Sequence, residues 1–206
     1  MVLKTLKWPV LFCYLTLLNC REDNLNISVF PIDTKMAPFL FDTSSLWIYK
    51  NATTLQTDTE IVISAKRMNI YKKGATLLCW NMIFKNLTTR EEQSYDIVYQ
   101  GWWEKFQDKA LMEDNSNRIV DSNKVNYYSR QMQLLDSLYI NGKLYRNIRR
   151  FRVEAYPDSA ANTYNQYFIA DSIGIIRWDR FNKGVNTGSK FLIDYRIKLA
   201  PNWNSP

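Results

Sequence analysis

Polar and apolar positions alternate with a period of two along most of this chain. Phe191–Leu199 is the clearest case, because its odd positions are apolar and most of its even positions are charged. Side chains at i and i+2 of a strand point to the same face, so this alternation predicts a half-buried strand. Aromatic and β-branched residues, which favour strands, are frequent in further segments. These are Leu46–Lys50, Glu60–Ile70, Leu77–Phe84, Tyr95–Trp103, Tyr164–Ala170 and Ile173–Phe181.

An Asn-Gly pair at residues 141–142 predicts a β-hairpin. It lies between two segments that both look extended, Leu134–Ile140 and Leu144–Tyr156, and Asn-Gly suits the tight turns of hairpins. The apolar positions of the second segment change from even to odd numbers part-way along it. This change of phase predicts a β-bulge near Arg149 and Arg150.

Together these segments predict an all-β fold. About nine short strands at near-regular spacing are typical of an antiparallel meander that forms a barrel, a half-barrel or a sandwich. No segment keeps a 3.6-residue period over enough length to predict a helix. Gln100–Ala110 fits a partly helical segment and the end of a strand equally well.

The first 38 residues follow a different pattern. Lys4 and Lys7 precede the apolar run Trp8–Leu18, which has the layout of a secretory signal and is shorter than the roughly 20 apolar residues of a transmembrane helix. Arg21–Pro38 is polar at first and then irregular, as expected of a flexible tether. We therefore expect a signal at 1–19, Cys20 and the tether at 20–38, and a single β-rich domain at 39–206.

The composition narrows the chemistry that the chain can carry. It contains no histidine, three cysteines and a formal net charge of +7. Without histidine, neither a Ser-His-Asp nor a Cys-His catalytic site can be assembled, and a zinc site of the usual types is disfavoured. Cys13 would leave with the signal and Cys20 has its own role, so Cys79 is expected to be a small buried side chain without a disulfide. We expect no cofactor, no metal ion and no nucleic-acid partner.

A cysteine directly after an apolar signal resembles the lipobox of bacterial lipoproteins. Two internal motifs, Ser45–Lys50 (SLWIYK) and Tyr167–Trp178 (YFIADSIGIIRW), resemble those of uncharacterised lipoproteins of the Bacteroidota. The resemblance implies that the signal is cut before Cys20 and that the thiol of Cys20 is lipidated. It also implies an anchor in the outer membrane, at the cell surface if Arg21–Asp23 acts as an export tag, although these residues equally suit a solvated tether.

The resemblance further implies acceptor sites for O-glycans. In this phylum they have the form Asp-Ser/Thr-aliphatic, and three such tripeptides place the acceptor hydroxyl at Ser137, Ser159 and Ser172. Ser159 has the setting most typical of an exposed loop. Asp-Ser is also ordinary turn chemistry, so a purely structural role is an open alternative at each site.

Aromatic residues are the first candidates for ligand binding. Six of the seven tryptophans follow the signal; such rings stack on sugars or line apolar pockets, but they also fill β-cores. Neighbours on a strand point to opposite faces. With Tyr99 and Trp103 on one face, Trp102 is expected to be exposed and to serve a ligand, a partner or the tether.

Arginines are the second candidates. Arg149 and Arg150, with Arg146 and Arg152 beside them, could bind phosphate or carboxylate groups as arginine forks do. The alternative is positive charge on an edge strand, which discourages aggregation between sheets.

Three classes of function remain open. The first is an envelope lipoprotein whose domain is a non-enzymatic binding or structural module; if a half-barrel shelters an apolar or glycan ligand, its concave face should be lined by aromatic rings. The second is an accessory component of a surface uptake or secretion complex, with an exposed apolar patch for an envelope protein partner.

The third class is a hydrolase that uses two carboxyl groups close together in a pocket, with raised pKa values. Because the chain lacks histidine and any recognisable catalytic motif, we expect no enzymatic activity and favour the first class. The acids that could serve a hydrolase are Asp96, Glu104, Glu113, Glu154 and Asp179.

Overall fold

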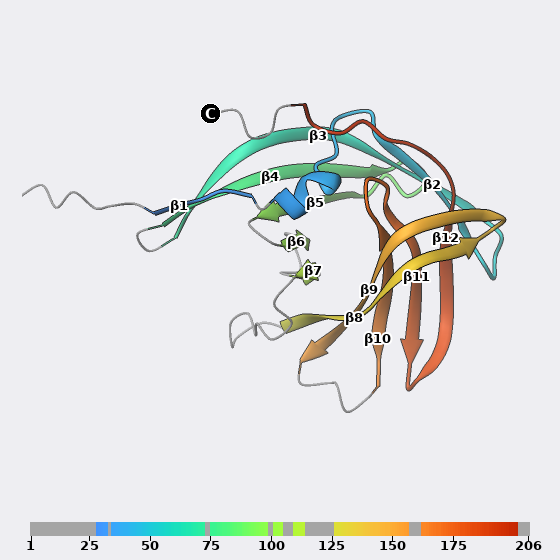
Figure 1. The fold of residues 1–206 in the computed structure, drawn as a ribbon. Helices are drawn as coiled ribbons and strands as arrows, with labels where there is room; N and C mark the ends of the chain where they lie inside the picture. The colour runs from blue at the N-terminus through green and yellow to red at the C-terminus, as the bar shows by residue number, and fades with distance from the viewer. Residues whose placement is uncertain are drawn as a thin grey trace, which may run out of the picture.

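A computed structural model describes residues 28–32, 34–72, 75–98, 101–104, 109–113, 126–156 and 162–201, with the backbone alone between 98 and 131. Within these residues the chain forms one short 3₁₀-helix and a twelve-stranded sheet (Figure 1). The elements are β1 (Ser28–Phe30), η1 (Thr34–Phe39), β2 (Leu46–Asn51), β3 (Thr57–Lys72), β4 (Ala75–Asn86), β5 (Glu92–Val98), β6 (Gly101–Glu104), β7 (Lys109–Glu113), β8 (Asn126–Ile140), β9 (Lys143–Tyr156), β10 (Tyr164–Ala170), β11 (Gly174–Asn182) and β12 (Val185–Arg196).

Apart from β1, the strands follow one another as an antiparallel meander with one exception. Their order in the sheet is β7-β6-β5-β4-β3-β2-β12-β11-β10-β9-β8, and β1 joins β4 in the parallel direction. The exception is the pairing of β2 with β12, which brings Leu46 opposite Arg196 at the centre of the sheet. The all-β antiparallel fold predicted from the alternation is confirmed. The short strands β1 and β7 were not predicted from the sequence, whereas most of β6 lies within the predicted strand Tyr95–Trp103.

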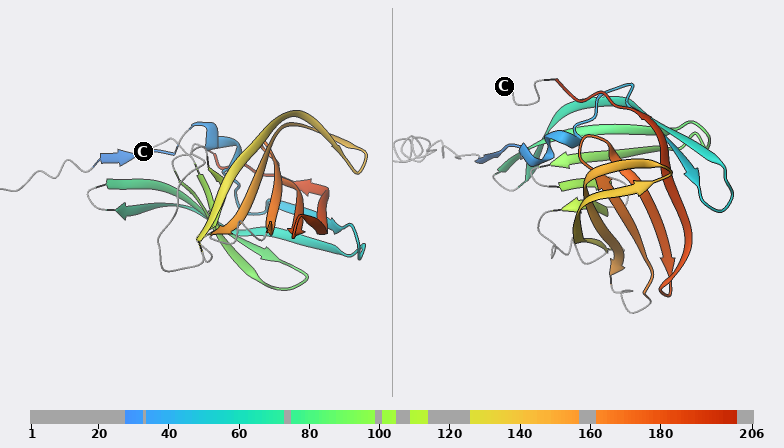
Figure 2. Two further views of the ribbon diagram at one scale, coloured as in Figure 1. Left: turned by 90° about the horizontal axis from the view of Figure 1, so that it is seen from below. Right: turned by 45° about the vertical axis from the view of Figure 1, so that its right-hand side comes forward.

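The sheet curls strongly around its inner face. Figures 1 and 2 show β3 and β4 as long arcs that cross above β9 to β12. The Cα atoms of the two edge strands, β7 and β8, approach within 8 Å of each other, although no ladder joins them in the described part of the chain. The register shifts in β3–β4, β10–β11 and β12–β2, and such bulges bend strands and increase their twist. The result is an incomplete barrel.

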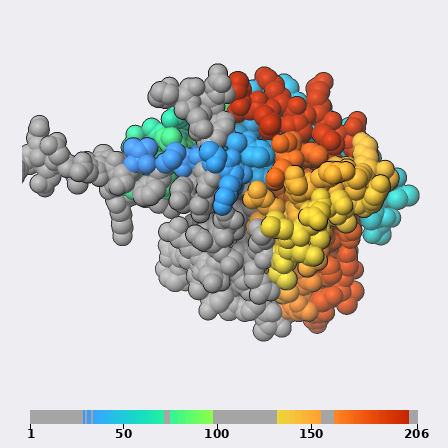
Figure 3. Space-filling model, viewed as in Figure 1, coloured from blue at the N-terminus to red at the C-terminus, as the bar shows by residue number. Residues whose placement is uncertain are grey.

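The segment of η1 packs against the inner face of the curled sheet. Phe39 and Phe41 are completely buried, and the space-filling view shows the blue atoms of this segment against those of β9 (Figure 3). The rings of Phe41 and Trp47 meet edge to face with centroids 5.0 Å apart. Gly174 permits this packing, because its φ is +92° and an added Cβ would lie 3.2 Å from the Phe41 ring. Each large side chain buried in this way stabilises the fold by about 1.5–3 kcal/mol.

The predicted hairpin at Asn141-Gly142 is confirmed. Ile140 pairs with Lys143, and both turn residues have the positive φ values that a tight hairpin turn requires. The predicted bulge lies in the same place but on the partner strand, because the register shifts between Gln131 and Gln133 of β8.

The prediction of a single strand over Tyr95–Trp103 is wrong. The chain reverses after Val98, and Val98 pairs with Gly101 at the start of the antiparallel strand β6. Apolar and polar residues alternate on both sides of this short connection, so the alternation alone does not reveal the break. Gln100–Ala110 contributes β6 and the start of β7, and the helical alternative for it is not seen in its described residues.

Candidate ligand pocket

A pocket of about 290 Å³ opens in the inner face of the sheet. It is formed by β2 to β5, by the turn between β4 and β5, and by β10 to β12. Five aromatic rings line it, together with polar and charged side chains. The rings are Tyr49, Phe84, Tyr95, Tyr167 and Trp178, and the main polar residues are Glu60, Asn86, Glu91, Gln93, Asn165 and Lys190.

Strand register aligns three of these residues in one row. Tyr167 of β10 pairs with Trp178 of β11, and Trp178 pairs with Lys190 of β12. Directly paired residues of an antiparallel sheet project from the same face, so the alternation along each strand is sufficient to direct all three side chains into the pocket. The inner face therefore matches the concave, aromatic-lined surface that the sequence predicts for a sheltered ligand.

The rings on the opposite wall are held by contacts beneath the pocket. Phe84 stacks on Trp47 with centroids 5.2 Å apart and meets Tyr95 edge to face at 5.0 Å. The Tyr49 hydroxyl donates a 2.9 Å hydrogen bond to the carbonyl of Ile175. These contacts fix the wall before any ligand arrives, which lowers the entropic cost of binding.

Glu60 of β3 is the unusual group in the pocket. Its side chain is half-buried and forms no hydrogen bond or ion pair with the residues that the structure describes. Burial raises the pKa of its carboxyl group from 4.5 to about 7; Lys190 opposes the rise and Asp58 adds to it. A carboxylate in this position is costly unless it is paired, so Glu60 is poised either to hold a proton or to meet a cation.

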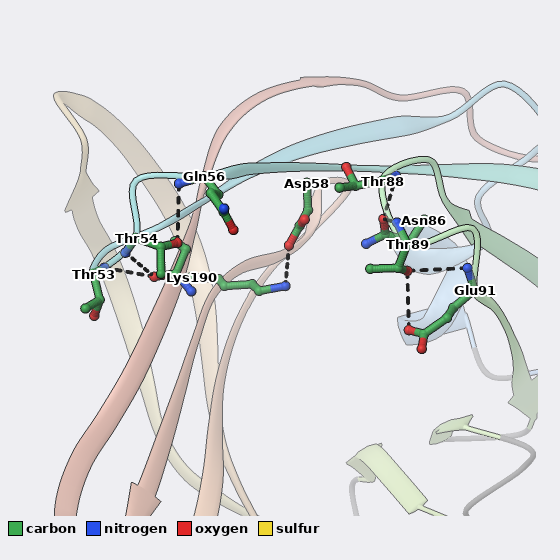
Figure 4. A network of polar contacts seen from close by, with 10 residues as sticks. Thr53, Thr54, Gln56, Asp58, Asn86, Thr88, Thr89, Glu91 and Lys190 are labelled. Atoms are coloured by element: carbon green, nitrogen blue, oxygen red, sulfur yellow. Dashed lines mark hydrogen bonds and ion pairs between the residues drawn. The ribbon is translucent and has the colours of Figure 1, made fainter.

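Lys190 is already neutralised. Its ammonium group pairs with the carboxylate of Asp58 (Figure 4) and lies 5.7 Å from the centroid of the Trp178 ring. Glu91, at the exposed rim, accepts a 3.3 Å hydrogen bond from the Thr89 hydroxyl. The charged side chains that line the pocket are therefore two carboxyl groups, Glu60 and Glu91, and the Lys190 ammonium group, whose charge Asp58 neutralises, in a chain whose formal net charge is +7.

The turn between β4 and β5 supplies one rim of the pocket. The Asn86 side-chain oxygen accepts hydrogen bonds of 2.9 Å from the backbone N–H groups of Thr88 and of Thr89, and Arg90 adopts a φ of +65°. Side-chain acceptance of this kind closes a turn locally. It positions Thr89 and Glu91 beside the pocket (Figure 4).

A second turn with the same construction joins β2 to β3. Asn51 accepts hydrogen bonds of 2.8 and 2.9 Å from the N–H groups of Thr53 and Thr54, and Leu55 has a φ of +60°. Both turns have the sequence Asn-x-Thr-Thr, yet the residues of this second turn do not line the pocket. The repeated Asn-x-Thr-Thr sequence is a feature from which two turns of the same kind could have been predicted.

The two arginines predicted to bind a ligand do not line the pocket. The guanidinium carbon of Arg149 lies 5.5 Å from the centroid of the Phe39 ring, and its Nε lies 3.6 Å from a carboxyl oxygen of Asp171. Arg150 pairs with Phe168, and its buried Nε has no hydrogen-bond partner among the described residues. Consecutive residues of a strand project to opposite faces, so the structure does not bring the two arginines together.

The remaining predicted sites are not tested by these geometries. Trp102 pairs with Ile97 in the β5–β6 register, but its side chain lies outside the described residues. Ser137 on β8 and Ser172 in the turn after β10 are both exposed. Cys20 and Ser159 lie outside the described residues, so lipidation and glycosylation stay predictions.

The candidate acids for a hydrolase have partners elsewhere. Asp96 accepts a 2.7 Å hydrogen bond from the Asn81 amide. Glu154 and Asp179 form ion pairs with Arg152 and Arg177. The side chains of Glu104 and Glu113 lie outside the described residues. In the part of the chain whose side chains are described, no three His, Cys, Asp or Glu residues gather as a metal site would require, and no helix there is long and apolar enough to span a membrane.

The sequence analysis did not single out Glu60. The residue shares the even-numbered phase of buried Val62, so a charged residue on the buried face of a strand was the available signal. Glu60 is the first residue of the predicted strand Glu60–Ile70, where a charge is unremarkable, so the signal is weak.

Neither a protein-family model nor a curated protein matches this sequence. Among solved structures, the chain is similar to a "putative lipoprotein" from Parabacteroides distasonis, known from a crystal structure at 2.70 Å resolution. The likeness covers 83% of this chain and 100% of that chain, with a TM-score of 0.42 and 6% sequence identity. Values this low carry no assignment of ligand or activity.

Proposed function

We propose that this protein is a non-enzymatic ligand-binding module of the bacterial cell envelope, and that the pocket in the inner face of its sheet is the binding site. One observation carries the proposal: the curled sheet encloses about 290 Å³ between five aromatic rings, with a carboxyl group that lacks a partner among the described residues. Small-molecule sites have this character, being concave, mostly apolar and equipped with a few polar groups that fix orientation.

The placement of the acidic residues supports binding rather than hydrolysis. Asp96, Glu154 and Asp179 are held by an amide or an arginine away from the pocket. Hydrolysis by paired carboxyl groups needs a proton donor and a second carboxylate facing each other across the scissile bond. Of the carboxyl groups at this pocket, Glu91 stands at the exposed rim and Asp58 is engaged by Lys190.

The envelope location rests on Cys20 and the signal before it. A lipid on the Cys20 thiol would hold the domain at a membrane, because two or more acyl chains give stable anchoring. Replacing Cys20 by Ser is expected to abolish labelling by a fatty-acid probe and to leave the signal uncleaved at this position. Labelling that persists in Cys20→Ser would refute the anchor and leave the pocket to be judged separately.

The pocket is tested by filling it. Asn165→Trp adds a large ring inside the pocket, and Ser137→Trp adds the same ring at an exposed position of β8 as a matched control. The purified proteins are incubated with a small-molecule extract of bacterial envelopes and examined by native mass spectrometry.

We expect the wild type and Ser137→Trp to retain the same bound mass and Asn165→Trp to lose it. Circular dichroism verifies that all three proteins are folded. Equal retention by folded Asn165→Trp, or no retention by the folded wild type, would contradict the proposal.

A further inference from the structure

We propose that the pocket recognises a primary ammonium group, which the Glu60 carboxylate binds inside a recess walled by aromatic rings. The inference rests on the proposed function, since it names the class of ligand for that same pocket. It is carried by the shape of the recess, by the charges around it and by an interaction that the pocket already contains.

The recess lies at the Glu60 end of the pocket. Its walls are Glu60, Ile175 and the rings of Trp47, Tyr49, Phe84 and Tyr95, and its free volume is about 10 Å³. This is close to the space of a single water-sized group. An –NH₃⁺ group fits such a space, whereas a trimethylammonium group is several times larger.

The charges favour a cation over a neutral or anionic group. Glu60 and Glu91 line the pocket, with Lys190 as the single cation among its described lining residues, and Asp58 pairs with Lys190. Since Asp58 already neutralises Lys190, the Glu60 carboxylate has no cationic partner among the described residues. A carboxylate that is partly shielded from water and lacks a partner is costly, and an ammonium group supplies both the opposite charge and up to three hydrogen-bond donors.

The opposite wall shows that the rings of this pocket tolerate a cation. The Lys190 ammonium group lies 5.7 Å from the centroid of the Trp178 ring, within the range of cation–π attraction. Beyond the recess, the pocket is lined by the rings of Tyr167 and Trp178 and by polar side chains such as Gln93 and Asn165. The two rings suit an aromatic group attached to the amine, and the polar side chains can contact polar substituents on it, so the ligand class is a primary amine with an aromatic body.

Binding should depend on pH through Glu60. The titratable or charged groups that face it are Lys190 on β12, Asp58 on its own strand, Tyr49 on β2, Tyr95 on β5 and Glu91 in the β4–β5 turn. Burial raises the pKa of the Tyr49 phenol well above its usual value of 10, so Tyr49 remains neutral. The pKa of Glu60 is about 7, and an amine should therefore bind about tenfold more tightly at pH 8 than at pH 6.

The test uses phenethylamine as the probe and calorimetry as the readout. 2-Phenylethanol has the same body with a neutral head, phenethyltrimethylammonium has a larger cationic head, and methyl glucoside represents a neutral sugar. At pH 8 we expect phenethylamine to bind at least tenfold more tightly than the other three compounds. Glu60→Gln should remove this preference and its pH dependence, while the control Glu92→Gln, at an exposed position that does not line the pocket, should change the affinity less than threefold.

The outcomes separate this inference from the proposed function. Equal or tighter binding of phenylethanol or methyl glucoside, if lost in Asn165→Trp, would overturn the ammonium site and leave the pocket as a binding site. Amine binding that survives in Glu60→Gln, or a wild type that binds none of the four compounds, would also overturn it. Retention of bound mass by the pocket-filled variant would overturn both proposals.

Discussion

Carboxyl groups that are shielded from water differ in their ion-pair partners between the two faces of the sheet. On the outer face, Glu154 and Asp179 each form an ion pair with an arginine two positions earlier on the same strand, at 2.7 and 2.9 Å. On the inner face, the residue two positions before Glu60 is Asp58, a second acid, and the nearby cation Lys190 is paired with that acid. Residues at i and i+2 share a face, so Arg-x-Glu and Arg-x-Asp supply their own partner, whereas Asp-x-Glu does not.

This difference separates a structural carboxylate from one available to a ligand. On the outer face, Glu154 and Asp179 are each paired with an arginine only two positions away on the same strand. At Glu60 the local sequence prevents such pairing, and the fold then encloses the group among aromatic rings. The contrast supports a role for Glu60 outside the stability of the fold.

The strongest test of the contrast is Glu60→Gln. The pKa of Glu60 is raised from 4.5 to about 7 in the folded protein, so the stability that its proton provides is present below pH 4.5 and is lost as the pH rises through 7. Gln cannot ionise and should raise the free energy of unfolding at pH 8 by up to about 3 kcal/mol, with little change at pH 4. Urea unfolding at both pH values measures this; a variant with the same pH slope as the wild type would contradict the assignment.

The opposite effect is expected for Asp179→Asn on the outer face. Asp179 is buried, and its loss leaves Arg177 without a carboxylate. The Arg177 side chain is 39% exposed and can be rehydrated, so the cost should be about 2 kcal/mol rather than that of a fully buried pair. Urea unfolding at pH 7 gives the value, and Asp136→Asn at an exposed position serves as the control. Equal stabilities of the two variants would show that the outer pair contributes nothing.

The two Asn-x-Thr-Thr turns have the same hydrogen bonds, but only the turn at Asn86 lines the pocket. Asn51→Ala and Asn86→Ala each remove two hydrogen bonds to backbone N–H groups, and each should cost about 1 kcal/mol in thermal or urea unfolding. Only Asn86→Ala should weaken ligand binding, because its turn alone lines the pocket. Equal loss of binding in both variants would mean that the effect is global rather than local.

The smallest effect is expected where a carboxylate is exposed. Glu92 forms an ion pair with Lys85 at 3.1 Å, and the two side chains are 49% and 37% exposed. Lys85→Ala should change the free energy of unfolding by less than about 0.5 kcal/mol, since exposed pairs contribute little. A larger loss would indicate that shielding from water is not what distinguishes Glu60 from the paired acids.

The sequence predicted the parts of this structure that depend on local pattern. Alternation is sufficient to predict the strands, and the Asn141-Gly142 hairpin follows from two residues whose φ values are positive. The reversal between β5 and β6 was not predicted, because apolar and polar residues alternate on both sides of it. The unpaired state of Glu60 was not predicted for a different reason. It depends on the pairing of Asp58 with Lys190, which lies 132 residues later in the chain. The Asp-x-Glu spacing is visible in the sequence, but its meaning depends on that distant register.

The pairing of β2 with β12 has a consequence for the order in which the molecule is built. Tyr49 comes from β2 and Lys190 from β12, so the pocket is not complete until nearly the whole chain has been made. Contacts across so long a separation form slowly, because the intervening chain must first be brought together. The binding site is therefore a late product of folding, and a chain that ends before β12 would lack it even if every earlier hairpin had formed.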